Sequence, residues 1–140
     1  MTVHDVERVT LPAADMDRER ALRAVHARLL EQRGERAVVA SRRFGEGCLV
    51  LGLAGDLTRG AASRLRRMLT DRHDECSRAL VVTLTHVDSW DPHLARVLGW
   101  ARIRHLAAGG TVELHDAPPD LLQALGNATA TCYEVTDDRR

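Results

Sequence analysis

Short apolar runs alternate with amphipathic stretches along this chain of 140 residues. Runs rich in aliphatic and β-branched residues predict strands. Between the first two runs, the glycines of the turn 45–47 can supply the left-handed backbone that a tight hairpin needs. The predicted strands are 36–44, 48–53, 79–84, 111–115 and 131–135.

Amphipathic periodicity predicts a helix after the second strand. Either Asp56 or Thr58 can cap its first turn, and the pattern continues to about residue 75. Small and aliphatic residues recur on one face of this helix, while arginines lie mainly on the others. The face predicted to lie on the sheet carries Ala61, Ala62, Leu65, Met68 and Leu69.

A second helix follows the third strand through an expected polar turn, 85–91. Asp91 can cap this helix and Pro92 can occupy its first position, where the missing N–H of proline costs nothing. The glycines at 109–110 end the helix. A short third helix is expected at 120–125.

The first 35 residues predict an N-terminal helical extension. A helix over 16–33, with Asp15 as its cap, would present a narrow apolar stripe to one neighbour. Residues 36–140 then form the main domain, with the element order β-β-α-β-α-β-α-β. A hairpin followed by β-α alternation predicts an α/β fold with a mixed sheet of about five strands and helices packed on it.

Charge and composition narrow the possible functions. Twenty arginines and no lysine balance twenty acids, so the net charge disfavours a nucleic-acid or anionic-membrane binder. Without lysine there is no phosphate-loop lysine, Schiff base or lysine general base. The three cysteines have no metal-binding spacing, and no apolar run is long enough to cross a bilayer. These features predict a cytoplasmic protein without cofactor or metal.

From about residue 36 to residue 135 the chain resembles the STAS domain family, the bacterial anti-sigma factor antagonists. Residues 55–58, Gly-Asp-Leu-Thr, are similar to the family's Gly-Glu-Leu-Asp turn into its first helix. Residues 80–85 are similar to the family's strand that ends in Asp-Leu-Ser. Asp91 has the spacing of the aspartate that precedes the second helix. The resemblance implies a STAS-like fold and a role in partner switching during transcription regulation.

The residues at the family's phosphorylation motif differ from the family pattern. Pro92 stands where the resemblance places the serine that a partner kinase phosphorylates, and His93 stands at the following serine. Leu94 replaces a glycine, while Thr58 and Thr83 replace aspartates. A proline has no hydroxyl to accept a phosphate, so we expect a STAS domain without the usual phosphorylation switch. Asp91 would remain as a fixed negative charge, or simply as an ordinary helix cap.

Two alternatives remain open near this motif. Ser89 follows Asp88 and could be a displaced phosphoacceptor, although it lies too early for the family spacing. His86, Asp88, Asp91 and His93 could together ligate a divalent metal, but their spacing matches no helical pair.

Partner binding is the function that these features favour, and no nucleophile–base pair or cofactor loop predicts an enzyme. The expected partner is an anti-sigma factor or serine kinase-like protein, bound without phosphorylation at residue 92. The alternative is a STAS-type scaffold in a homodimer or with another STAS protein, using the N-terminal helix and a Trp100 that faces away from the sheet. The predicted partner-binding residues are Asp56, Thr58, Ser89, Asp91, His93, Arg96 and Trp100.

Overall fold

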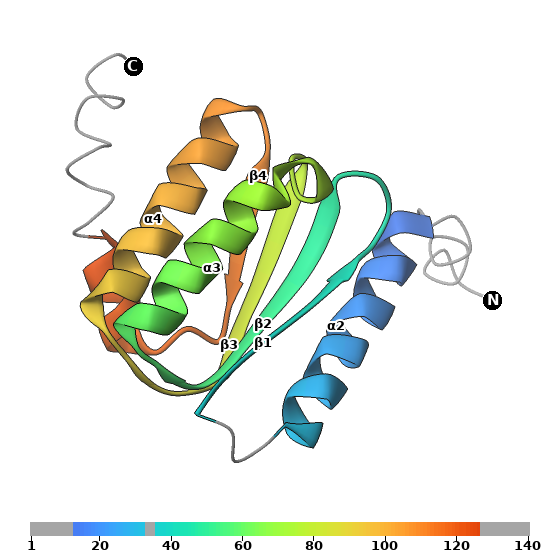
Figure 1. Ribbon diagram of the computed structural model, residues 1–140. Helices are drawn as coiled ribbons and strands as arrows, with labels where there is room; N and C mark the ends of the chain where they lie inside the picture. The colour runs from blue at the N-terminus through green and yellow to red at the C-terminus, as the bar shows by residue number, and fades with distance from the viewer. Residues whose placement is uncertain (1–12, 33–35, 127–140) are drawn as a thin grey trace.

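The computed structural model describes residues 13–32 and 36–126. Within them, four strands form one sheet in the order β1-β2-β3-β4 (Figure 1). The strands are β1 (Ala37–Arg43), β2 (Cys48–Leu57), β3 (Ala79–Trp90) and β4 (Thr111–His115). β1 pairs with β2 in antiparallel orientation, and the other neighbours are parallel. The α/β class with a mixed sheet is confirmed, and the predicted strand 131–135 lies outside the described residues.

Helices cover both faces of the sheet (Figure 1). α3 (Arg59–Asp71) and α4 (Pro92–Ala107) lie side by side on one face, and α2 (Ala13–Glu31) lies on the other. A short 3-10 helix, η1 (His73–Glu75), follows α3, and residues 119–126 are helical. In the described ranges, no helix has both the length and the apolar character that crossing a membrane requires.

Local sequence signals account for most of the element boundaries. Gly45 and Gly47 adopt φ values of 65° and 71° in the hairpin turn, as the sequence predicts. Thr58 caps α3 and Asp91 caps α4. Two expectations were wrong: Asp15 lies inside α2 rather than at its cap, and α3 ends at Asp71, with η1 occupying the rest of the expected helix.

The face of the sheet under α3 and α4 holds the larger core. Its fully buried side chains are mostly leucines, which interdigitate with the alanines and leucines of the two helices. The strands contribute Leu49, Leu51, Leu53, Leu57, Leu80, Val82 and Leu84, and the helices contribute Ala61, Ala62, Leu65, Leu69, Leu94, Val97, Leu98 and Ala101. The sequence predicted the buried face of α3.

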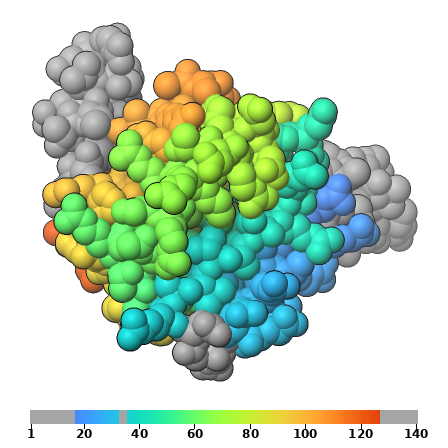
Figure 2. All heavy atoms as spheres, viewed as in Figure 1, coloured from blue at the N-terminus to red at the C-terminus, as the bar shows by residue number. Residues whose placement is uncertain are grey.

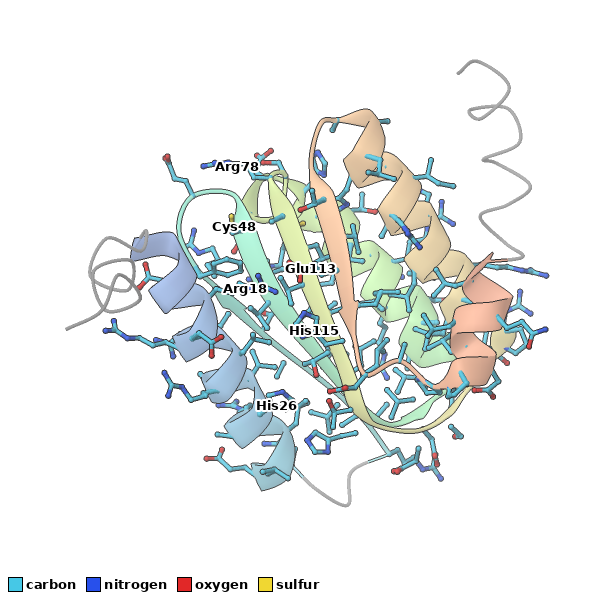
Figure 3. The ribbon with its side chains drawn as sticks, turned by 180° about the vertical axis from the view of Figure 1, so that it is seen from behind. Arg18, His26, Cys48, Arg78, Glu113 and His115 are labelled. Atoms are coloured by element: carbon cyan, nitrogen blue, oxygen red, sulfur yellow. The ribbon has the colours of Figure 1, made fainter. Side chains whose placement is uncertain are left out.

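The opposite face is covered by α2, which packs closely on small residues. Ala21, Val25 and Leu29 of α2 are buried against the strands. A Cβ at Gly52 would overlap the Val25 side chain, so only glycine allows this close approach. At the other end of α2, Arg18 forms an ion pair with Glu113 on β4 (Figure 3). The predicted stripe is therefore used inside the chain, while the division into 1–35 and 36–140 stays a prediction.

The expected turn 85–91 is wrong, because β3 continues as a strand to Trp90. Two β-bulges in β3 make this extension possible: the register with β2 shifts between Gly52 and Ala54, and again between Gly55 and Asp56. β3 thereby remains paired with β2 along its whole length. β2 is also longer than predicted, and it ends at Leu57 beside Trp90.

Candidate partner-recognition site

The extended ends of β2 and β3 place two predicted site residues in contact. Asp56 pairs with Ser89 in the parallel ladder, and the Ser89 Oγ donates a hydrogen bond of 2.7 Å to the Asp56 Oδ1. Both residues are exposed. The sequence places these two residues 33 positions apart, and the sheet register brings them together at one surface.

Directly after this pair, each of the two strands leads into a helix. The Thr58 Oγ1 accepts a hydrogen bond of 3.2 Å from the Ala61 N–H, so Thr58 acts as the cap of α3. The hydroxyl stands where the family resemblance implies an aspartate, and it satisfies one backbone donor without adding a charge. Thr58 is exposed beside Asp56 and belongs to the same surface.

The start of α4 completes the surface. The Asp91 Oδ1 accepts a hydrogen bond of 2.8 Å from the His93 N–H, and Pro92 occupies the first helical position. The Asp91 N–H in turn donates to the Leu57 carbonyl oxygen at 2.8 Å, which ties this cap to the end of β2. Asp91 is therefore held in place by bonds to two elements, with its carboxylate at the positive end of the helix dipole.

These residues form a surface with fixed negative charge, which we call the acidic end: Asp56, Asp88, Ser89 and Asp91. Asp56 and Asp88 are exposed, and Asp91 is half-buried. Among the described residues, none of these carboxylates forms an ion pair with a cation. The acidic end is therefore suited to contact basic or hydrogen-bond-donating groups of another molecule.

A groove adjoins the acidic end on the side of α2. It has a volume of about 520 Å³ and lies between the C-terminal part of α2 and the ends of β2 and β3. Asp56 and Asp88 line it together with Arg36, His86 and the exposed Leu30. No local sequence pattern assigns Leu30 or Arg36 to the site, because the packing of α2 across the sheet brings them there.

The remaining predicted site residues lie away from the acidic end. Arg96 is exposed on α4, and Trp100 follows it one helical turn later. Trp100 is half-buried against the core of the α3–α4 face, and the guanidinium groups of Arg66 and Arg104 lie over its ring. The N-terminal helix does not cover Trp100, because α2 lies on the opposite face of the sheet (Figure 1).

The sequence left open a metal site at His86, Asp88, Asp91 and His93. Across residues 13–32 and 36–126, no group of three or more histidine, cysteine, aspartate or glutamate side chains is arranged to hold a metal ion. His86 instead lies edge-on to His26 of α2, with ring centroids 5.6 Å apart. The continuation of β3 explains this, because it separates residues that a compact turn would have gathered.

Comparisons with known proteins match this arrangement to a family. The family model described as "Mlab, STAS domain" matches residues 40–129, which include the acidic end, α3 and α4. A solved structure described as "Crystal Structure Analysis of Mglu" is similar over 51% of this chain, with 30% sequence identity and a TM-score of 0.44. The similar part amounts to 17% of that chain. No match was found among the curated proteins.

Proposed function

Because the chain belongs to the family of Mlab-type STAS domains, we propose that it is a non-enzymatic regulatory module that binds a protein partner through the acidic end. The expected partner is an anti-sigma factor or serine kinase-like protein. Binding would not be controlled by phosphorylation at Pro92, which has no hydroxyl. The cytoplasm is the compartment that fits such a partner.

The observation that supports this proposal most strongly is the link between the two strand ends. The Ser89–Asp56 hydrogen bond and the Asp91–Leu57 backbone bond hold both helix starts in one rigid surface. A surface that is already ordered loses less conformational entropy when a partner binds. The geometry therefore supports recognition of a folded partner.

Phosphorylation of Ser89, the alternative acceptor, would work against this geometry. Its Oγ lies 2.7 Å from a carboxylate oxygen of Asp56, so a phosphate there would place two anions in contact. The nearby Asp88 and Asp91 would add to the repulsion. We therefore propose that Ser89 acts as a hydrogen-bond donor that fixes Asp56.

Charge reversal at the acidic end tests the proposal. We expect Asp56→Arg to weaken binding to a purified serine kinase-type anti-sigma partner by about tenfold or more in isothermal titration calorimetry. The matched control is Asp74→Arg, which makes the same charge change at an exposed residue of η1. Equal weakening by both variants, or a phosphate found on Ser89 by mass spectrometry after incubation with partner and Mg-ATP, would contradict the proposal.

The scaffold alternative now depends mainly on the surface around Trp100. The apolar stripe of α2 is buried on the sheet of its own chain, so it does not offer a free oligomerisation face. Light scattering separates the two functions, since a scaffold would form a stable assembly without a partner. A monomer that binds the anti-sigma partner would support the regulatory module.

A further inference from the structure

The outer surface of α3 and α4 carries a strong local excess of positive charge. The two helices contain seven arginines and one acid, although the whole chain is neutral. Elsewhere in the described residues, acids outnumber arginines. Figure 2 shows α3 and α4 side by side at the surface of the molecule. We call their arginines the arginine face: Arg59, Arg64, Arg66, Arg67, Arg96, Arg102 and Arg104.

These arginines form no ion pair with any acid that the structure describes. The ion pairs between described residues involve the arginines at 18, 20, 43 and 72, and none of the seven on the arginine face. Like charges on adjacent helices repel one another, so this arrangement destabilises the isolated chain. Of the chain's twenty acids, none of the described ones lies within ion-pair distance of these seven side chains.

The charge order along α3 also opposes helix stability. The first turn of α3 contains Arg59 and no acid, and its last turn contains no basic residue. A helix dipole favours the reverse order, with acids first and bases last. The positive charges of α3 are therefore not explained by the stability of the helix itself, which points to an interaction with another molecule.

Trp100 provides an anchor at the centre of the arginine face. The Cζ atoms of Arg66 and Arg104 lie 4.9 Å and 5.2 Å from the centre of its ring. A guanidinium that stacks on an aromatic ring still directs its N–H groups outward, where they can bind a carboxylate in bidentate fashion. Tryptophan and arginine are also the residues that most often dominate binding energy at protein interfaces.

We propose that the arginine face docks a segment rich in aspartate and glutamate on a partner protein, with carboxylates bound at Arg66 and Arg104 beside Trp100. This inference rests on the proposed function as a binding module, and it adds a second surface with opposite charge to the acidic end. The two surfaces would contact different parts of a partner, or two partners.

A carboxylate-rich protein fits better than a nucleic acid or a membrane. A base could stack on Trp100 only by displacing the two guanidinium groups that already lie over the ring. A membrane would require an apolar surface, but Leu106 is the one exposed large hydrophobic residue of α3 and α4. Net neutrality further weakens the long-range attraction to either polyanion.

Poly-L-glutamate can serve as the carboxylate probe in calorimetric titrations of the full chain at low salt. We expect the double variant Arg66→Gln/Arg104→Gln to bind this probe about tenfold more weakly than the unaltered chain. The matched control is Arg23→Gln/Arg42→Gln, which removes two exposed arginines from α2 and β1 without removing an ion pair between described residues. The control should bind within about twofold of the unaltered chain, and thermal melts verify folding of both variants.

Three other outcomes would each overturn the inference. These outcomes are no binding of the probe, equal weakening by both double variants, and tighter binding of single-stranded DNA or of phosphatidylglycerol vesicles than of poly-L-glutamate at the same ionic strength. The Asp56→Arg variant keeps the two proposals apart, because it should bind poly-L-glutamate at least as well as the unaltered chain. Failure at one surface then leaves the other surface supported.

Discussion

The two faces of the sheet are packed in different ways. Leucines from three strands, such as Leu51 and Leu84, fill the face under α3 and α4. Small residues line the face under α2, including Ala54 and Gly52, and the hydroxyl-bearing Thr83 is fully buried there. The difference indicates that the α3–α4 face supplies most of the stability, whereas the α2 face is shaped to let a helix approach closely.

The candidate site is also divided between the two faces of the sheet. The family match begins at residue 40, after α2, and it includes the whole α3–α4 face. α2 nevertheless forms one wall of the groove beside the acidic end. Disturbing α2 should therefore change the groove while the rest of the domain stays folded, and the following variants test this separation.

The largest effect is expected from Leu51→Ala on the α3–α4 face. Leu51 is fully buried, and removing a buried leucine side chain leaves a cavity that costs about 2–5 kcal/mol of unfolding free energy. The matched change on the other face, Leu29→Ala, removes the same buried side chain and should cost about half as much, because α2 can shift to fill the space. Urea denaturation measures both, and equal losses would contradict the proposed difference between the faces.

A smaller and more local effect is expected from Gly52→Ala. The added methyl group would overlap Val25 and press against Leu29, so α2 must shift, at a cost of about 1–3 kcal/mol. Amide hydrogen exchange should show reduced protection in α2 and unchanged protection in α4. The double variant with Val25→Ala should recover part of the loss.

The control for this prediction lies on the α3–α4 side of the sheet. A methyl group added at Gly60 would enter open space, since the nearest atom, the Thr58 Oγ1, would be 3.9 Å away. Gly60→Ala should leave stability unchanged or raise it by up to about 1 kcal/mol, because alanine favours the helix. If Gly60→Ala destabilised the protein as much as Gly52→Ala, close packing of α2 would not be the cause.

The smallest expected effect is a difference in thiol reactivity between two cysteines. Cys76 belongs to the core of the α3–α4 face, and burial raises the pKa of its thiol above the ordinary value. Cys48 is half-buried beside the α2 face. In a Cys132→Ser background at pH 8, Cys48 should react first with a thiol reagent, because Cys76 forms less thiolate. Equal reaction rates would show that the α3–α4 core opens readily.

Much of the fold follows from short-range signals in the sequence. The glycine turn 45–47, the Asp91-Pro92 helix start and the strand Thr111–His115 were all predicted from local residue types and are confirmed. Each of these features depends on the backbone preferences of a few neighbouring residues. The prediction of Asp15 as a helix cap was wrong, because α2 already includes Asp15.

The candidate site was harder to predict because it depends on long-range pairing. Polar residues such as His86 and Ser89 suggested a turn, whereas pairing with β2 makes them part of a strand. The contact of Arg66 with Trp100 joins two helices that are separate in the sequence. Local patterns identify Trp100 as unusual, but only the packing of α3 against α4 shows what covers its ring.

The two bulges of β3 set which side chains face which helix. Before the first bulge, even-numbered residues such as Leu84 face α3 and α4; between the bulges Val87 packs into that core; after the second, Trp90 packs there again. Each bulge adds one residue to β3, so after both bulges the core-facing residue is even-numbered again. Loss of the extra residue at either bulge would restore regular pairing and leave the side chains beyond it on their present faces, whereas loss of a residue between Ala79 and Val82 would exchange inward and outward side chains from there to the first bulge. Natural variation in chain length should therefore be rarer between Ala79 and Val82 than at the two bulges.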